Sequence, residues 1–179
     1  MAFSFLIAEA DHIIFSRITT TPNEAEMVAI YNPTSSIINL SNYYLSDVSE
    51  NLSGHHYYNL PLAIDYWPES NSDFIARFPN IDIAPNQTIT IGLHDSISFN
   101  SYYSVDPDIT LQEDMLDIDN EGTIGSSSNI LLDNYESLIL FYWDEGNSQV
   151  VKDVDYFAWG AVAIPYYGIN KTGVDGYFD

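Results

Sequence analysis

An acidic stretch near the middle of the chain holds the residues most suited to chemistry. Asp117, Asp119 and Glu121 alternate there, and Gly122 is the sixth residue counted from Asp117. Calcium-binding loops place oxygen ligands at alternate positions and a glycine at the sixth, where the chain turns sharply. Ser128 occupies the twelfth position, which normally carries a bidentate glutamate. The missing glutamate favours a solvated acidic loop, with a Ca²⁺ site at Asp117, Asp119 and Glu121 that takes further ligands from elsewhere as the alternative.

Two other groups of residues could bind a cation. Asp153 and Asp155 alternate along an apparent strand, so we expect them to share its solvent face, where they would discourage edge pairing or form a second cation site. His55 and His56 are adjacent, and adjacent side chains on a strand point to opposite faces. That arrangement does not favour joint binding of one metal ion.

The sequence contains no established catalytic motif. It lacks the G-x-S-x-G, H-E-x-x-H, Walker and dinucleotide-binding patterns, and it has no cysteine for a nucleophile, a disulfide or a thiolate metal site. A pair of carboxylates can hydrolyse a glycoside, but any chain with 26 acids offers such a pair. We therefore expect no enzymatic activity, with a hydrolase that uses an unrecognised carboxylate site as an alternative.

Tyrosine is abundant, with 14 copies, and several occur as doublets. A doublet on a strand would place one ring in the core and the other outside, where it could stack on a sugar or contact a protein. The alternative is that these residues simply reflect the high strand propensity of tyrosine. The doublets are Tyr43-Tyr44, Tyr57-Tyr58, Tyr102-Tyr103 and Tyr166-Tyr167.

The charge balance excludes several classes of partner. Four Lys and Arg residues against 26 Asp and Glu give a net charge of −22, so no basic face can form for nucleic acid or for an anionic membrane. No apolar run approaches the roughly 20 residues needed to span a bilayer, which predicts no membrane insertion. The acidic excess keeps a protein dispersed and suits salty surroundings, so we expect an extracellular or cell-surface location for a mature or excised module.

Short strands dominate the predicted secondary structure. Residues 27–31 are apolar on both faces, which indicates a central strand. Ser72 to Phe78 has the spacing of a short helix stopped by Pro79, and 94–105 matches neither period. We expect residues from about 104 to 129 to form an exposed acidic insertion. The C-terminal part is expected to be a loop-rich tail. We predict one all-β domain over 1–179, an immunoglobulin-like β-sandwich, with further strands at 12–18, 55–60, 88–93, 136–144 and 149–160.

The order of these segments resembles the lamin-tail domain, an immunoglobulin-like sandwich found in nuclear lamins and in many bacterial secreted or surface proteins. The segment EAEMVAIYNP matches the family's central strand, and Leu45 and Asp47 match the Leu-x-Asp turn that follows. IAPNQTITIGL is similar to the family's proline, turn and strand segment, and VDYFAWG followed by INKTGVDG resembles the end of its bacterial branch. The resemblance covers roughly residues 12–176. Met27 and Ala29 depart from the pattern, where the family has an aromatic residue and a second glutamate.

The resemblance implies an interaction module, because lamin-tail domains in bacteria are appended to enzymes and surface proteins whose catalytic parts lie elsewhere. We accordingly expect a non-catalytic docking module of a secreted or surface bacterial protein, with a protein or a surface glycan as partner. A calcium-assisted carbohydrate-binding module is the second reading, with Ca²⁺ as its cofactor.

Overall fold

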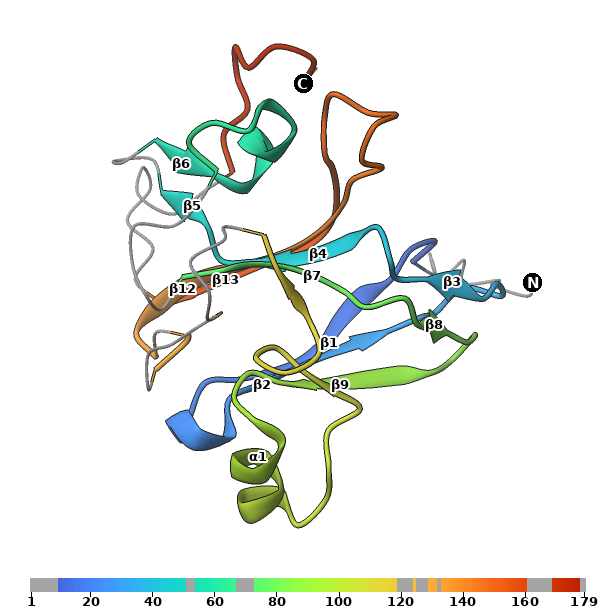
Figure 1. The fold of residues 1–179 in the computed structure, drawn as a ribbon, viewed down its shortest axis with the longest axis vertical. Helices are drawn as coiled ribbons and strands as arrows, with labels where there is room; N and C mark the ends of the chain where they lie inside the picture. Colours follow the sequence, from blue (N-terminus) through green and yellow to red (C-terminus); the bar gives the residue numbers. More distant parts are fainter. Residues whose placement is uncertain are drawn as a thin grey trace, which may run out of the picture.

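Two β-sheets lie face to face in the computed structural model, which describes residues 10–50, 54–66, 73–118, 124, 129–131, 133–160 and 169–177 (Figure 1). The first sheet has the strand order β1-β2-β9-β10, and the second has β11-β7-β4-β12-β13. Two short strand pairs, β3 with β8 and β5 with β6, extend the edges. The strands of the first sheet are β1 (Ile14–Thr19), β2 (Met27–Tyr31), β9 (Thr88–Gly92) and β10 (Ile109–Thr110). Those of the second sheet are β4 (Tyr43–Ser46), β7 (Ile75–Arg77), β11 (Leu116–Asp117), β12 (Tyr135–Tyr142) and β13 (Lys152–Gly160), and those of the short pairs are β3 (Ile38–Asn39), β5 (Ser49–Glu50), β6 (His55–His56) and β8 (Asp82–Ile83).

The chain crosses between the sheets several times. It leaves the first sheet after β2, enters the second at β4, returns at β9 and crosses again at β11. The set β1-β2-β9 facing β7-β4-β12-β13 is the arrangement of an immunoglobulin-like sandwich. The prediction of an all-β sandwich is confirmed.

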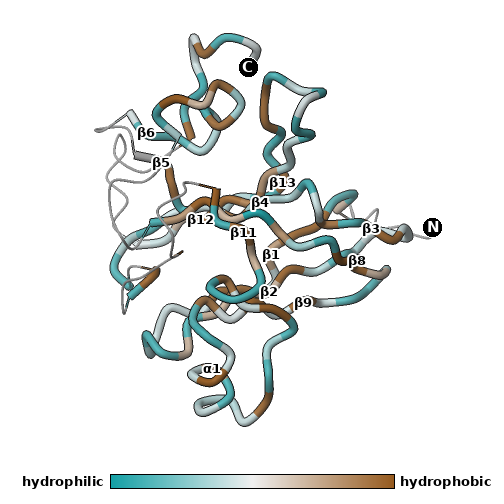
Figure 2. Tube along the Cα trace, in the orientation of Figure 1, coloured by the Kyte–Doolittle hydropathy of each residue, from teal (hydrophilic) through white to brown (hydrophobic). Residues whose placement is uncertain are grey.

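Apolar side chains fill the space between the sheets and cover both outer faces. Figure 2 shows apolar residues along the strands and polar ones in most of the connections. On β2, Val28 and Ile30 enter the interior core, whereas Met27 and Ala29 face outward onto Phe99. The central position predicted for this strand is therefore confirmed. An outer cluster covers the other face of the second sheet and contains Tyr44, Val48, Tyr57, Tyr58, Leu60, Ile75, Ile139, Phe141 and Val151.

Three helices complete the described part of the chain. They are η1 (Asn23–Ala25), η2 (Tyr57–Leu62) and α1 (Ser96–Tyr103). The Asp95 side chain caps α1 by accepting a hydrogen bond from the Ser98 N–H at 2.9 Å. Phe99 then packs on β2, and the Tyr103 hydroxyl donates to the Ala25 carbonyl at 3.0 Å. The apolar residues of 94–105 show no clear helical spacing because only one residue of α1, Phe99, is buried.

Three predictions about local structure are wrong. Residues 75–77 form β7 rather than a helix, because this segment lies between β4 and β11 and pairs with both. The strand predicted over 55–60 ends at His56, and η2 follows. The acidic segment is not exposed throughout, because β10 pairs with the first sheet, β11 pairs with the second, and apolar residues in and around β10 enter the interior core. The buried apolar residues of this segment are Ile109, Leu111, Met115 and Ile124.

A buried carboxylate joins the first sheet to the segment that precedes β12. The Glu26 side chain is 0% exposed and accepts hydrogen bonds from the backbone N–H groups of Ile130 at 2.9 Å and Leu131 at 3.1 Å. His94 Nε2 lies 3.1 Å from the same carboxylate. A buried carboxylate without hydrogen-bond donors is strongly unfavourable, so these bonds stabilise the folded state. They hold residues 130–131 against the start of β2.

We expect Glu26→Gln to lower the free energy of unfolding by about 3 kcal/mol, because an amide cannot accept hydrogen bonds on both of its polar atoms and each bond to a charged group contributes roughly 1.5 to 3 kcal/mol. Urea denaturation measures this loss. Glu24→Gln, an exposed change two residues away, should stay within about 0.5 kcal/mol of the wild type. Equal stabilities of the two variants would contradict the role given to Glu26.

Candidate functional site

A pocket of about 580 Å³ opens where β13 begins, beside the first residue of β4 and the last residue of β12. This volume falls within the range of roughly 300 to 1,000 Å³ that is usual for small-molecule sites. Its lining combines aromatic, aliphatic and charged side chains. The described lining residues are Asp11, His12, Ile38, Tyr43, Tyr142, Lys152, Asp153 and Val154.

Two tyrosines from neighbouring strands form the aromatic wall of the pocket. Tyr43 and Tyr142 are directly opposite each other in the pairing of β4 with β12. Their ring centroids are 5.3 Å apart, and the ring planes meet at 75°. Burial raises the pKa of Tyr43, with a further contribution from Tyr142, so its hydroxyl stays protonated at neutral pH. The pair therefore offers ring surface and hydroxyl donors in one place.

Charged groups surround these rings. His12 Nδ1 lies 2.9 Å from the Asp11 carboxylate, and this hydrogen bond lowers the pKa of Asp11. Lys152 is exposed on β13 and lies directly opposite Tyr142 across the strand pair. Asp153 follows Lys152 and accepts two hydrogen bonds on Oδ1, from the Tyr57 hydroxyl and the Lys171 ammonium, each at 2.7 Å.

A β-bulge decides where the two aspartates of β13 point. Leu140 pairs with Asp155 and Phe141 pairs with Asp153, so Val154 is an extra residue on β13. Asp153 consequently bonds to Tyr57 of the outer cluster, whereas Asp155 accepts the Phe15 N–H of β1 at 2.6 Å. The prediction that Asp153 and Asp155 share a solvent face is wrong, because the bulge shifts the alternation by one residue.

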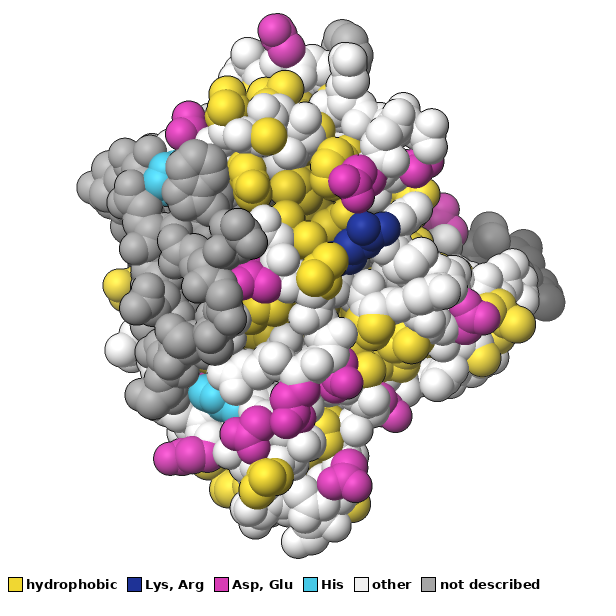
Figure 3. Space-filling model, in the orientation of Figure 1, with side chains coloured by type: hydrophobic (Ala, Val, Ile, Leu, Met, Phe, Trp, Pro, Cys, Tyr) yellow, Lys and Arg dark blue, Asp and Glu magenta, His cyan; other side chains and the backbone are white. Residues whose placement is uncertain are grey.

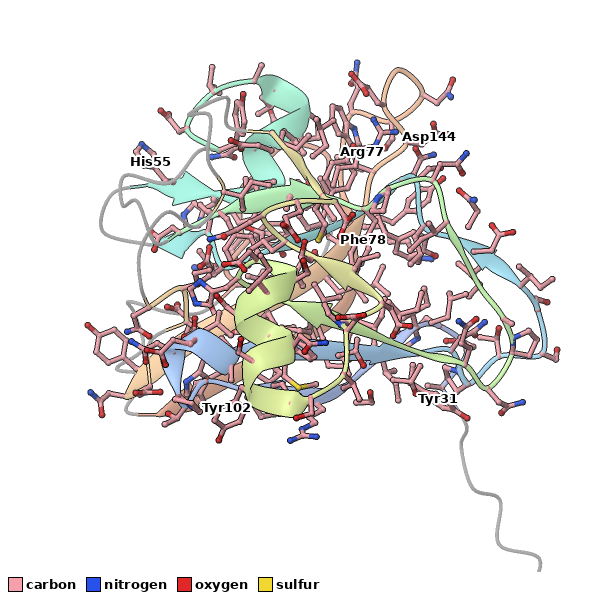
Figure 4. The ribbon with its side chains drawn as sticks, turned by 60° about the horizontal axis from the view of Figure 1, so that its bottom comes forward. Tyr31, His55, Arg77, Phe78, Tyr102 and Asp144 are labelled. Carbon is pink, nitrogen blue, oxygen red and sulfur yellow. The ribbon has the colours of Figure 1, made fainter. Side chains whose placement is uncertain are left out.

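The basic side chains have different environments. Arg77 donates to Asn42 Oδ1 at 2.9 Å and to Glu145 Oε2 at 3.3 Å, and it lies over the Tyr44 ring. Figure 4 shows Arg77 and Asp144 at one edge of the molecule, far from Tyr102 on α1. On the face drawn in Figure 3, acidic side chains are widely spread and basic atoms show in one small area. Lys152 is the basic residue among the described residues of the pocket lining.

The structure describes one of the three residues expected to bind calcium. Asp117 is half-buried in β11, opposite Ala76, whereas Asp119 and Glu121 lie outside the described residues. In the described part of the chain, no group of three or more His, Asp or Glu side chains is arranged to hold a metal ion. Calcium binding remains a prediction, and thermal melts in millimolar Ca²⁺ and in EDTA test it because a ligand of the folded state raises the midpoint.

The histidine pair and one tyrosine doublet are buried together. The His56 ring stacks on Tyr58 with a centroid distance of 4.6 Å, and burial lowers the pKa of His56. Tyr57 is 0% exposed and Tyr58 is 5% exposed, so neither ring of this doublet faces solvent. The prediction of one ring inside and one outside is wrong here, because the doublet lies in η2 rather than in a strand. Tyr102 is 56% exposed and Tyr103 is half-buried, but this doublet lies in α1 and so does not follow the alternation predicted for a strand.

Sequence reasoning missed the assembly of the pocket. It singled out Asp153 as a possible cation ligand and Tyr43 as half of a doublet, but it did not bring them together. Lys152 and Lys171 were counted only as charges. The available signal was the scarcity of basic residues, which number four in the whole chain.

The fold of this chain is similar to that of a protein of known structure. A DUF4876 family protein from Bacteroides thetaiotaomicron is similar with a TM-score of 0.49 and 16% sequence identity, over 85% of this chain. The chain spans about half of that protein, 51% of its length. No family model and no curated protein matches the sequence. Among the described residues, no helix is long and apolar enough to cross a membrane.

One buried acid lies away from the pocket and affects stability rather than binding. Asp47 follows β4, is 5% exposed, and accepts the Phe74 N–H at 2.7 Å on Oδ1. Its Oδ2 atom has no hydrogen-bond partner among the described residues. Burial, together with repulsion from Asp73 and Glu136, raises the pKa of Asp47 well above its usual value of 3.8.

We expect Asp47→Asn to be more stable than the wild type at pH 7, with an advantage that shrinks as the pH falls toward 4. The folded state holds the Asp47 proton more tightly than the unfolded state, so wild-type stability falls as the pH rises from about 3.8 through the folded pKa. The Asn side chain keeps Oδ1 for Phe74 and carries no charge. Urea denaturation between pH 4 and pH 8 measures the difference.

Asp133→Asn is the control of opposite sign, because the Thr21 hydroxyl lowers the pKa of Asp133 in the folded state. Its stabilising contribution is present above the unfolded pKa and is lost as the pH falls. If the difference in free energy of unfolding between Asp47→Asn and the wild type does not change with pH, the pKa of Asp47 is not raised in the folded state.

Proposed function

We propose that this chain is a non-catalytic binding module of the lamin-tail type, and that the pocket beside β13 binds a saccharide. The observation that carries the proposal is the Tyr43–Tyr142 pair with charged groups around it in a pocket of about 580 Å³. Sugars present C–H faces that stack on aromatic rings and hydroxyls that both donate and accept hydrogen bonds. The pocket offers both kinds of contact.

The polar groups of the pocket fit recognition better than hydrolysis. A glycosidase needs one carboxylic acid with a raised pKa to protonate the leaving group. Asp11 is 97% exposed and its pKa is lowered by His12, which is the opposite of that requirement. Asp153 accepts hydrogen bonds on Oδ1 from the Lys171 ammonium and the Tyr57 hydroxyl. These two carboxylates are suited to accept hydrogen bonds from ligand hydroxyls.

The net charge supports the nature and location of the partner. At −22, the molecule repels polyanions, so a neutral saccharide is favoured over an acidic one. The same charge suits a secreted or cell-surface bacterial protein, where salt screens charges beyond about 10 Å. A docking role on a surface glycan therefore follows from the pocket and the charge together.

The test is a glycan array with the wild-type protein, followed by affinity measurements on the strongest neutral saccharide. We expect Tyr142→Ala to weaken binding about tenfold, because loss of an aromatic contact of about 1.4 kcal/mol changes the dissociation constant by that factor. Calorimetric titration gives the constants, and thermal melts show that the variant is folded.

Tyr102→Ala is the matched control, because Tyr102 is 56% exposed on α1 and lies outside the described pocket lining. It should bind like the wild type. A wild-type protein that binds no saccharide, or equal losses in both variants, would refute the proposed function.

A further inference from the structure

A lysine from the C-terminal segment fills a cage of tyrosine rings next to the pocket. The Lys171 ammonium lies 5.2 Å from the Tyr57 ring centroid, 5.5 Å from that of Tyr58 and 4.5 Å from that of Tyr177. Its side chain is 12% exposed, and it is paired with Asp153 at 2.7 Å. Such a desolvated ammonium over several aromatic faces is held strongly, because the rings present their negative faces to it.

The cage is built by two separate parts of the chain. Tyr57 and Tyr58 belong to η2, and Tyr177 comes from the described C-terminal segment 169–177, which lies beside η2 in Figure 1. The Tyr58 hydroxyl donates to the Asn170 carbonyl at 3.1 Å, and the Val151 N–H donates to the Tyr177 hydroxyl at 2.9 Å. These bonds place the segment on the outer cluster, next to the start of β13.

The cage and the pocket share one carboxylate. Asp153 lines the pocket, and its Oδ1 accepts from both Lys171 and the Tyr57 hydroxyl. Within the described residues, no hydrogen bond reaches Oδ2. Burial raises the pKa of Tyr57 far above 10 and that of Tyr177 to about 12, so both phenols stay neutral and Tyr57 remains a donor. Two donors on one oxygen hold the carboxylate in one orientation and leave its second oxygen to a ligand.

We propose that Lys171 is a positioning residue for the pocket: its ammonium, seated in the tyrosine cage, orients Asp153 so that Oδ2 accepts a hydrogen bond from the ligand. The C-terminal segment must then lie on the outer cluster for the pocket to bind at full affinity. The affinity part of this inference rests on the proposed function, whereas the orientation of Asp153 does not.

The first experiment measures that orientation without any ligand. We expect NMR scalar couplings between Hα and Hβ to show one χ1 rotamer for Asp153 in the wild type and rotamer averaging in Lys171→Met, which keeps the length of the side chain and removes its charge. Arg17→Met is the control, because it removes one positive charge from an exposed residue outside the cage. Unchanged Asp153 couplings in a folded Lys171→Met variant overturn the inference.

The second experiment measures binding of the saccharide selected on the array. We expect Lys171→Met to weaken binding about tenfold and Arg17→Met to leave it unchanged. Lys171→Ala with added n-propylammonium chloride should regain most of the lost affinity, because this ion replaces the missing part of the side chain, and sodium chloride at the same concentration should not. Thermal melts show that the variants are folded at the titration temperature, so lost stability does not account for the weaker binding, and absence of rescue by the amine contradicts a positioning role.

The two proposals fail in different ways. If the wild type binds no saccharide but Lys171→Met changes the Asp153 couplings, the proposed function is wrong and Lys171 still orients Asp153. If the wild type binds a saccharide and Lys171→Met binds it equally well, the pocket is the site and the inference about Lys171 is wrong. Hydrogen exchange of residues 169–177, compared with that of β4 and β12, should match the wild type in Lys171→Met, because the bonds of Tyr58 and Val151 to this segment remain.

Discussion

Hydrogen bonds from backbone N–H groups satisfy the carboxylates that the packing of this sandwich buries or half-buries, a task for which basic side chains are too few. Glu26 accepts from Ile130 and Leu131, Asp47 accepts from Phe74, and Asp155 accepts from Phe15. With four basic residues against 26 acids, most carboxylates have no cation available. A buried carboxylate without a donor is strongly unfavourable, so the backbone supplies the donors. The Asp155–Phe15 bond joins β13 of the second sheet to β1 of the first, the Glu26 bonds hold residues 130–131 against the start of β2, and the Asp47–Phe74 bond ties the end of β4 to the start of β7.

Two of the four basic side chains, Arg77 and Lys171, make specific contacts. Arg77 bridges the turn after Leu40 to the turn at Glu145, and Lys171 enters an aromatic cage. In a chain of this composition, an aromatic cage is an effective partner for a cation because it needs no further carboxylate. Asp153 joins Lys171 there and also faces the pocket, so one residue connects the packing of the C-terminal segment with the candidate binding site.

The fold was largely predictable, because period-2 alternation is a local property. Residues 27–31 are apolar on both faces, and β2 does pack on the interior core on one side and on Phe99 on the other. The prediction of a helix over 72–78 is wrong. The spacing of Phe74, Ile75 and Phe78 is compatible with a helix or a strand, and pairing with β4 and β11 makes the segment a strand. The prediction that Asp153 and Asp155 share a face is wrong for another reason. The extra residue at Val154 reverses the alternation, and a bulge has no reliable sequence signal.

What the sequence determined by itself was the two-faced character of the strands, and therefore a sandwich, together with an acidic exterior unsuited to polyanions. Tertiary structure alone decided which acids are buried and which residues meet in the pocket. Phe15 and Asp155 are 140 positions apart, and Tyr57 and Asp153 are 96 apart. The environment of a carboxylate depends on donors that the topology brings from such distances, and a local pattern carries no information about them.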